Sequence, residues 1–415
     1  MTASHRTPPL TGLRIVESTM LAPGMVGMHL ADLGAEVVKV EAPGTGDYIR
    51  SMAFPIVDGI SLLHWHVNRG KRSIALDLRT PEGIATYLDL VRGADAVIEG
   101  MRPGALARRG LTYERLRDVN PRIVFCTLSG YGVTGPYAEM PSHGIAYDAW
   151  AGVARPARDA DGFPRIPSYT TIGINAGPLY AALGVLALVH RARLTGEGGR
   201  FEVAQSDAAA SFNWNGIEGN KAYERSEDEV TGNDGDGKGA RRPVGDDSMT
   251  ESVRYQYYES RDGMVLFMAS EREFWKNFCE GIGRPELFSE NPGARFADHA
   301  RGNVVLHREL TAIFKTRTTR EWVDFGRTAN TPIAPVNTTV SIRDDPQFQA
   351  RIGFRPWQQH GTDLMPSPIT MIDETLPVPQ KAPVGVGEDT EAVLRDVLGY
   401  DEARIAALRA AGALG

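Results

Sequence analysis

The stretch from Leu10 to Asp47 constrains the fold more than any other part of this chain, because it predicts a complete strand, turn, helix and strand. Leu13 to Val16 and Val37 to Val40 are short runs typical of buried parallel strands. Between them, Pro23 stands at a first helical position and Gly34 at a helix end. The unit predicts a parallel α/β sheet whose helix N-terminus presents backbone N–H groups to an anion.

A dinucleotide-binding turn is the first alternative for this stretch. Glu41 lies about twenty residues beyond the turn, where an acid holds a ribose hydroxyl in such proteins. The fingerprint G-x-G-x-x-G is absent, because only Gly24 and Gly27 are present and Pro23 occupies the turn. A structural interpretation also stands, in which Gly24 merely permits the turn and Glu41 is a solvated strand end.

Composition argues against several classes of protein. The 415 residues exceed what a single core normally holds, so two domains or a large domain with an insertion are expected. A net charge of −7 disfavours nucleic-acid binding. Two distant cysteines, Cys126 and Cys279, indicate neither disulfides nor a zinc site. The longest apolar segment, Ala176 to His190, is too short to span a bilayer. We expect a cytoplasmic protein without metal, nucleic-acid or membrane partners.

Strands and helices continue to alternate after the opening unit. Thr80-Pro81-Glu82 predicts a capped helix start, and the apolar stretch Gly177 to Leu194 predicts a helix buried against the sheet. Further strands are expected at Ser73 to Leu76, Ala96 to Glu99 and Ile123 to Leu128, and further helices at Thr80 to Arg92 and Thr112 to Asn120.

A change of composition at Ser226 predicts a second domain. Residues 226–248 are almost free of large apolar side chains and predict a flexible linker, in which Asp234 and Asp236 lack the further ligands of a calcium loop. We assign 1–225 to a large domain, 249–335 to a small domain and 336–415 to a Pro-rich segment returning to the large domain. Elements are expected in these last two parts at Arg254 to Glu259, Met264 to Met268, Glu271 to Gly281, Val304 to Lys315, Thr319 to Asn330, Thr390 to Leu398 and Glu402 to Ala411.

Two basic clusters lie at predicted strand ends. Asn68 to Arg72 precedes one strand, and Glu99 to Gly104 follows another, with Arg108 and Arg109 just beyond. Such clusters in an acidic protein indicate a phosphate-bearing ligand, although a solvated surface explains them as well. His143 lies in a loop after a Gly-rich turn, where an imidazole is placed for proton transfer.

Several blocks of sequence together resemble the class III CoA-transferase family, which includes formyl-CoA and carnitine CoA-transferases and the related α-methylacyl-CoA racemases. They occur in family order over nearly the whole chain, and this agreement is more specific than any single block. The blocks are LADLGAEVVKVEAPGTGD, NRGKRSIALDLRTPEG, IEGMRPGALARRGL, NPRIVFCTLSGYGVTGPYA and ALVHRARLTGEGGRFEVAQSDA, followed by the Pro-rich C-terminal passage.

The resemblance implies an α/β fold with a Rossmann-like large domain built from both chain ends, a smaller α+β domain and two interlocked copies. It implies coenzyme A or an acyl-CoA as substrate, together with a small carboxylic acid. The sequence departs from the family in having Ala-Pro-Gly at residues 22–24, where Ala-Gly-Pro is usual, and Ala42 where an adenine-side Arg often sits. By the resemblance, the residues that line the CoA site are Leu21, Ala22, Pro23, Lys71, Arg72, Arg102, Arg108 and Tyr147.

The family's catalytic carboxylate is missing here. The resemblance implies an Asp that attacks the acyl-CoA thioester to form a mixed anhydride and then carries CoA as an enzyme thioester. That Asp aligns with Ile174, or with Gly173 if the gap shifts, and no acidic residue occurs between Asp161 and Glu197. The racemase branch pairs a His with the same Asp and supports that His with a Glu.

His143 matches the racemase His and Glu271 matches the supporting Glu, so three hypotheses follow. The first is a CoA-transferase whose carboxylate comes from Asp148, from Glu271 or from a partner subunit that retains the Asp. The second is an isomerase, epimerase or lyase in which His143 removes a proton α to the thioester carbonyl. The third is a non-catalytic CoA-binding subunit of a hetero-oligomer. A homodimer and a heteromer with an Asp-containing paralogue both remain open.

Overall fold

A computed structural model describes residues 7–52, 55–230, 241, 243–245, 249–294, 297–357, 362–372, 374–376, 379 and 381–415. The chain forms two compact units, one made of Met1–Asn213 with Gln349–Gly415 and the other of Trp214–Phe348. The boundaries expected from the sequence, at 226–248 and 335–336, fall near these divisions without coinciding with them. Much of the expected linker, including Asp234 and Asp236, lies outside the described residues.

A six-stranded sheet, parallel throughout, forms the centre of the larger unit. Its order is β10-β7-β6-β1-β2-β5, and Val16 of β1 pairs with Val38 on one side and Val97 on the other. Counted along the chain this order is 3-2-1-4-5-6, that of the doubly wound dinucleotide-binding fold. The strands are β1 (Arg14–Thr19), β2 (Glu36–Glu41), β5 (Lys71–Ala75), β6 (Ala96–Gly100), β7 (Val124–Ser129) and β10 (Gly199–Ala204).

The predicted parallel α/β sheet is confirmed, and the five strands expected in it all form. The edge strand β10 was not expected, because charged residues take its exposed positions. Arg200 and Glu202 alternate there with partly buried Phe201 and Val203. This strand is identified by its pairing with β7, in which Phe201 stands opposite Cys126, and such a pairing cannot be read from the local sequence.

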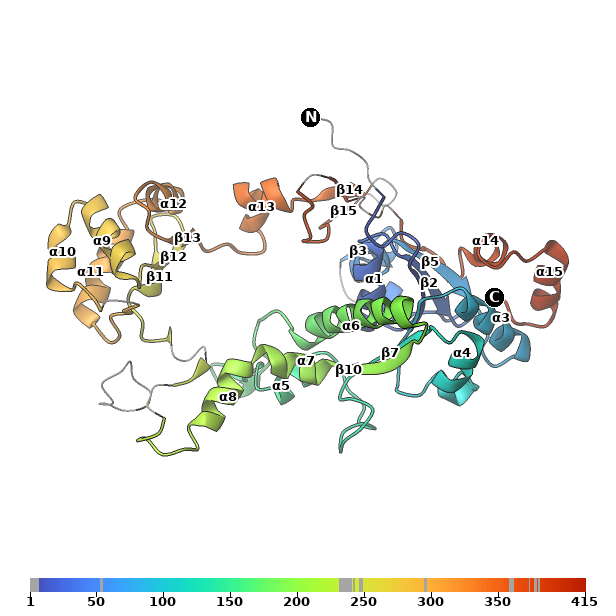
Figure 1. Ribbon diagram of the computed structural model, residues 1–415. Coiled ribbons are helices and arrows are strands. Elements are labelled where there is room, and N and C mark those ends of the chain that lie inside the picture. The colour runs from blue at the N-terminus through green and yellow to red at the C-terminus, as the bar shows by residue number, and fades with distance from the viewer. Residues whose placement is uncertain are drawn as a thin grey trace. The chain divides into compact units, whose positions relative to one another are not determined.

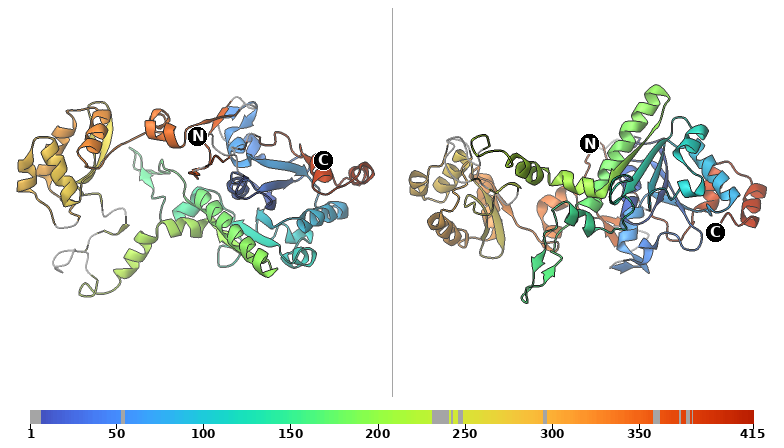
Figure 2. Two further views of the ribbon diagram at one scale, coloured as in Figure 1. Left: turned by 45° about the horizontal axis from the view of Figure 1, so that its top comes forward. Right: turned by 90° about the horizontal axis from the view of Figure 1, so that it is seen from below.

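Helices cover both faces of the sheet, as Figures 1 and 2 show. On one face, Val26 and Leu30 of α1 (Met25–Ala31) pack with Ala181 and Val185 of α6 (Gly173–Thr195). The other face is covered by α3 (Pro81–Arg92), α4 (Tyr113–Val119), α14 (Thr390–Asp396) and α15 (Glu402–Ala410). The sequence's closing helices therefore return to this sheet.

The long helix α6 is apolar enough, by length and composition alone, to cross a membrane. Its contacts fit a core helix instead, because Ala181, Val185 and Val189 are buried against the sheet and α1. Its outer side carries exposed apolar residues, among them Leu179 and Leu183. The expected burial of this helix is therefore confirmed for one of its faces.

The smaller unit has a three-stranded antiparallel sheet and an aromatic core. Its order is β11-β12-β13, and the predicted hairpin is formed by β11 (Tyr255–Glu259) and β12 (Met264–Met268), with β13 (Ile333–Pro335) on the far side of β12. Phe267, Phe278, Phe314 and Trp322 pack together in the core. Its helices are α8 (Trp214–Ala222), α9 (Arg272–Gly281), α10 (Pro285–Glu290), α11 (Val304–Phe314) and α12 (Thr319–Thr328).

Short elements connect these layers. Among the described residues, the remaining helices are η1 (Ala22–Gly24), η2 (Tyr48–Ser51), α2 (Leu62–Asn68), η3 (Ala107–Arg109), α5 (Ile145–Trp150), α7 (Gln205–Phe212), η5 (Ser341–Asp344) and α13 (Pro346–Arg351). The remaining strands are β3 (Ile56–Val57), β4 (Ile60–Ser61), β8 (Ala157–Arg158), β9 (Pro164–Arg165), β14 (Arg355–Trp357) and β15 (Thr362–Leu364).

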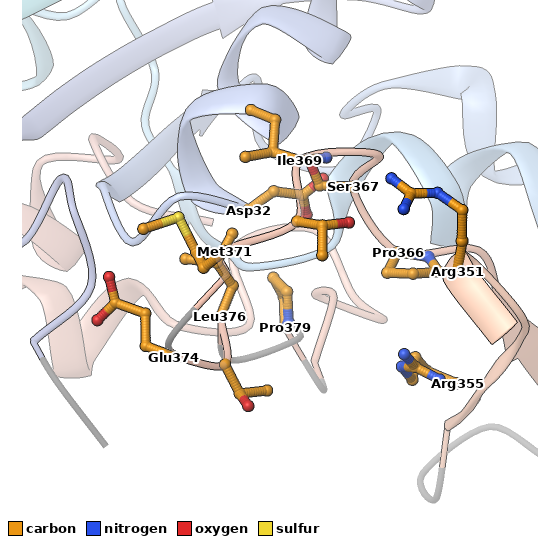
Figure 3. A pocket seen from close by; sticks show the side chains of 12 residues that line it. Asp32, Arg351, Arg355, Pro366, Ser367, Ile369, Met371, Glu374, Leu376 and Pro379 are labelled. Carbon is orange, nitrogen blue, oxygen red and sulfur yellow. The ribbon is translucent and has the colours of Figure 1, made fainter. Parts of the chain in front are cut away.

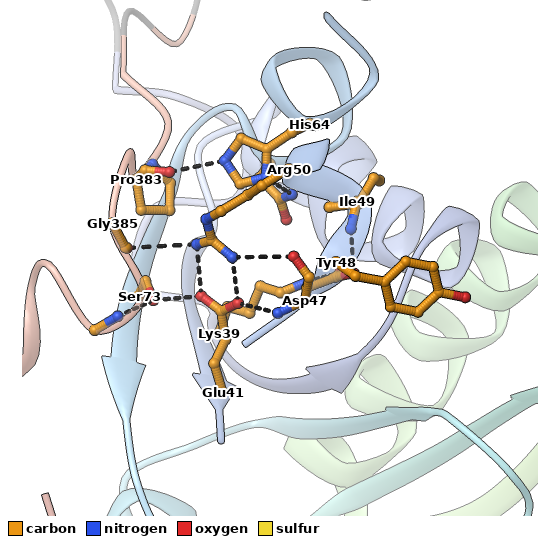
Figure 4. A network of polar contacts seen from close by, with 12 residues as sticks. Lys39, Glu41, Asp47, Tyr48, Ile49, Arg50, His64, Ser73, Pro383 and Gly385 are labelled. Carbon is orange, nitrogen blue, oxygen red and sulfur yellow. Dashed lines mark hydrogen bonds and ion pairs between the residues drawn. The ribbon is translucent and has the colours of Figure 1, made fainter. Parts of the chain in front are cut away.

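A buried carboxylate at the end of β2 ties the C-terminal segment to the sheet (Figure 4). Arg50 donates to both oxygens of Glu41, at 2.7 and 2.9 Å, and to the carbonyl of Val384 at 3.0 Å. Ser73 also donates to Glu41, and its hydroxyl accepts from Gly387 at 2.9 Å. Burial opposes ionisation of Glu41, but the Arg50 hydrogen bonds, with Lys39 and Ser73, lower its pKa to about 2.

We predict that Glu41→Gln destabilises the protein in a pH-dependent way. A carboxylate with a lowered folded-state pKa stabilises the fold fully above its usual pKa of 4.5 and loses that effect as pH falls toward 2. Urea unfolding is expected to show that the free energy of unfolding of the variant is about 3 kcal/mol lower than that of the wild type at pH 7. This difference is expected to shrink as the pH falls from 4.5 to about 2. Glu197→Gln, which removes an exposed carboxylate, serves as control; a deficit independent of pH contradicts the assignment.

Candidate functional site

A pocket of about 370 Å³ lies at the carboxyl edge of the sheet, where the strand order reverses. Residues 20–23 after β1 and residues 100–103 after β6 form two of its walls. The loops after β7 and β10 contribute further lining residues. Doubly wound folds bind ligands at this topological switch point, because the loops on the two sides leave in opposite directions and open a crevice.

The loop after β1 is held in a strained conformation. Leu21 has φ 60° and ψ −141°, a region that residues with a side chain rarely adopt and that costs about 1–3 kcal/mol. Its N–H donates to the carboxylate of Asp47, at 3.1 Å from Oδ2, and Lys39 Nζ binds the same oxygen at 2.8 Å. A buried ion pair therefore fixes the wall formed by Leu21, Ala22 and Pro23.

The two predicted basic clusters lie at opposite ends of the strands. Arg102 follows β6 and lines the pocket; its side chain is exposed, and no carboxylate of the described residues pairs with it. Arg108 is exposed outside the pocket lining and donates to the carbonyl of Pro103 at 3.0 Å. Lys71 and Arg72 begin β5, at the amino edge of the sheet.

Lys71 and Arg72, in the second cluster, form hydrogen bonds and ion pairs within the protein. Lys71 is fully buried, where Nζ donates to Glu17 at 2.8 Å and to the carbonyl of Gly24 at 2.6 Å. Burial lowers the pKa of Lys71 to about 8 despite the attraction of Glu17. Arg72 pairs with Glu36 and Asp396, at 3.4 and 3.3 Å. Neither residue contributes to the pocket lining described here.

Tyr147 and His143 lie together in the pocket wall that includes the start of α5. The Tyr147 hydroxyl accepts from Ser142 at 3.1 Å, its ring meets the Tyr131 ring edge-on at 5.6 Å, and burial raises its pKa. The His143 imidazole is exposed, and no hydrogen bond from the described residues engages it. A free imidazole beside hydroxyl groups is suited to accept or donate a proton.

Asp148 has a structural role in this arrangement. Its buried carboxylate accepts from the N–H groups of Ile172 and Gly173, at 3.0 and 2.8 Å, and from the Tyr169 hydroxyl at 3.0 Å. The first two contacts satisfy two of the free N–H donors at the start of α6. Asp148 does not line the pocket, and its oxygens are occupied by the helix that it supports.

The two positions aligned with the family's carboxylate differ in their surroundings. A Cβ added at Gly173 would lie 2.8 Å from the backbone oxygen of Gln205 and 3.0 Å from Cβ of Tyr147, so this backbone has no room for a side chain there. Ile174 lines the pocket. Of these two positions, one places an apolar side chain in the pocket and the other has no room for a side chain.

Among the described residues that line the pocket, none is an Asp or a Glu. Glu271 belongs to the other unit, at the N-terminus of α9, where its carboxylate accepts from Ser270 at 3.0 Å. The structure therefore places His143, Arg102, Tyr147 and the Leu21–Pro23 loop around one pocket.

Sequence reasoning missed several pocket residues. Gln205, Tyr48 and Tyr131 all line the pocket. Gln205 could have been identified as a polar residue directly after a strand, but that strand, β10, was not predicted from the sequence. Tyr131 lies in the Gly-rich turn that follows β7, between Gly130 and Gly132.

A second hollow, of about 230 Å³, lies beside the C-terminal end of α1 (Figure 3). Asp32 lies in its wall, and Arg351, Arg355 and Glu374 also contribute. Asp32 is already paired with Arg69 at 2.6 Å. Among the residues that the structure describes, no group of three or more His, Cys, Asp or Glu side chains could hold a metal ion.

Comparisons with known proteins agree with this architecture. Residues 10–390 match the sequence model of CoA-transferase family III. A succinate–glutarate CoA-transferase of Agrobacterium fabrum is 31% identical, with 84% of each chain covered. The succinyl-CoA–L-malate CoA-transferase beta subunit of Chloroflexus aurantiacus is 27% identical over 99% of each chain.

A solved structure extends the likeness to the fold. A CAIB/BAIF family protein from Brucella suis is 28% identical, has a TM-score of 0.73 and covers 95% of this chain and 100% of its own. The family match spans most of the sequence, and the named relatives are enzymes of CoA transfer. The protein therefore belongs to CoA-transferase family III and is an enzyme.

Proposed function

We propose that the pocket binds the thioester end of an acyl-CoA and that the protein moves CoA from this thioester to a small carboxylic acid. The observation that carries the proposal is the unpaired Arg102 in a pocket at the topological switch point. A free guanidinium there attracts the anionic groups of CoA or of a carboxylate substrate. The relatives named for succinate, glutarate and malate support this substrate class.

The proposed transfer requires a nucleophilic carboxylate, and Glu271 is the candidate that the family resemblance offers from this chain. The Asp148 carboxylate is already hydrogen-bonded to Tyr169 and to the first N–H groups of α6. Among the described residues, the Glu271 carboxylate accepts a hydrogen bond only from its neighbour Ser270. Attack of a carboxylate on the thioester carbon breaks the C–S bond, releases CoA as thiolate and leaves a mixed anhydride. A partner chain that carries the family Asp is the other source, and the beta-subunit name of one relative supports it.

A second candidate function follows from the free imidazole. His143 lines the pocket without a hydrogen-bond partner from the described residues, so it is available to remove a proton α to the thioester carbonyl. Such chemistry needs no nucleophilic carboxylate. It yields isomerase, epimerase or lyase activity on an acyl-CoA.

We further propose that two copies assemble as an interlocked dimer in the cytoplasm. Leu179, Tyr180 and Leu183 of α6 and Phe212 of α7 are exposed apolar side chains, and their exposed fractions run from 41% to 63%. Clustered exposed apolar residues of this kind favour contact with another chain. A heteromer with a related, Asp-containing chain would use the same surface.

We predict that Arg102→Ala weakens CoA binding. Loss of a charge-assisted hydrogen bond to an anion is expected to raise the dissociation constant about 10- to 100-fold. Isothermal titration calorimetry with CoA measures the change, and thermal unfolding should show an unaltered midpoint because the side chain is exposed. Arg92→Ala, on α3, is the matched control; equal affinity of both variants contradicts the proposed contact.

We predict that the purified chain transfers CoA from succinyl-CoA to glutarate and that Glu271→Gln abolishes this transfer. Mass spectrometry in deuterated water follows transfer and α-hydrogen exchange together. Exchange without transfer, lost in His143→Ala, would replace the proposal by the proton-transfer function. Absence of both reactions, with CoA still bound, would indicate a partner chain or a non-catalytic subunit.

We predict that Ile174→Asp raises the transfer rate by an order of magnitude or more, because it adds a carboxylate to a pocket whose described lining has none. The same side chain at Gly173 is expected to destabilise the fold by about 1–3 kcal/mol, since its Cβ would collide with Gln205. Initial rates and thermal unfolding of the two variants test both statements. A folded Ile174→Asp variant without any gain shows that more than the carboxylate is missing.

A further inference from the structure

One polar group in the pocket has no partner within the described residues. Gln205 is the first residue of α7, directly after the edge strand β10, and it is 4% exposed. Its Oε1 is buried without a hydrogen bond from the described residues. The buried carboxamide therefore leaves one acceptor unsatisfied. Such groups are rare in folded proteins and require an explanation.

Two glycines of α6 make room for this side chain. A Cβ at Gly177 would lie 2.9 Å from Cγ of Gln205, and a Cβ at Gly173 would lie 2.8 Å from its backbone oxygen. These glycines are four residues apart, so they lie on one face of the helix. The helix therefore lacks side chains where Gln205 packs, and Ile174 lines the same pocket.

We propose that Gln205 is a specificity-determining residue whose carboxamide binds an oxygen-bearing group, a hydroxyl or a carboxyl, on the acyl part of the substrate. This inference rests on the proposed function and names its acyl class. A carboxamide offers a donor and an acceptor, and both groups can engage it. An acyl group that is apolar throughout leaves the buried amide unpaired, so the site disfavours it.

Charge in the pocket agrees with this assignment. Gln205 is neutral, Tyr147 keeps its proton because burial raises its pKa, and Arg102 is the unpaired cation among the described lining residues. A hydroxyl needs only the amide, whereas a carboxylate gains from the nearby positive charge. An experiment can therefore distinguish an acyl group that carries a hydroxyl from one that carries a carboxylate.

Three four-carbon thioesters test the inference: butyryl-CoA, 3-hydroxybutyryl-CoA and succinyl-CoA. Wild-type protein is expected to bind at least one of the two polar thioesters about 10- to 100-fold more tightly than butyryl-CoA, measured by calorimetry. Gln205→Leu is expected to lose this preference while its affinity for butyryl-CoA is retained. Its thermal midpoint should not fall, because a buried unpaired amide is removed. Gln205→Met, unbranched like Gln, is the second variant should Leu prevent folding.

The outcomes separate this inference from the proposed function. Equal binding of the three thioesters by the wild type, or a preference that persists in folded Gln205→Leu or Gln205→Met, overturns the role of Gln205 alone. Failure to bind free CoA overturns the proposed function and this inference with it. Gln347→Leu, the same change at an exposed residue of α13 outside the pocket lining, is the control and should keep the preference for polar thioesters.

Discussion

The shape of the pocket depends on four charged groups that never touch it. Glu17, Lys39, Asp47 and Lys71 are buried beneath the loop after β1. Contacts of 2.8 Å pair Lys39 with Asp47 and Lys71 with Glu17, and a contact of 3.7 Å between Lys39 and Glu17 connects the two pairs. Removing one member of such a set leaves an uncompensated buried charge, which is far more costly than losing an exposed ion pair. Gly27 is required as well, because any Cβ there would overlap Glu17 Oε2.

The part of the fold predictable from the sequence is the part encoded locally. The opening strand, turn and helix were recognisable because Pro23 and Gly34 lie at helix boundaries and apolar runs mark the strands. Strand β10 was not, since Arg200 and Glu202 occupy its exposed positions and its identity depends on pairing with β7. Sheet order is likewise a property of pairings between distant segments.

The same division explains which site residues the sequence indicated. Arg102 and His143 follow strands or turns at the carboxyl edge, so position along the chain was enough to suggest them. Lys71 is also basic, but it lies at the start of its strand, at the opposite edge of the sheet. Its ammonium group is hydrogen-bonded to Glu17 and to the Gly24 carbonyl. Gln205 became visible only through the packing of two helix glycines against it, a contact that no local pattern contains.

The start of α6 shows why a carboxylate cannot simply be exchanged for its neighbour. Helix N–H groups and the positive end of the dipole stabilise one nearby anion, and here the amides of Ile172 and Gly173 are taken by Asp148. That carboxylate supports the helix and is withdrawn from the pocket, so it cannot also attack a substrate. Beside this turn, the pocket is lined by Ile174 of α6 and by the neutral amide of Gln205, which begins α7. Under the proposed function, Gln205 recognises the acyl group beside this turn, and the attacking carboxylate comes from an element other than the start of α6.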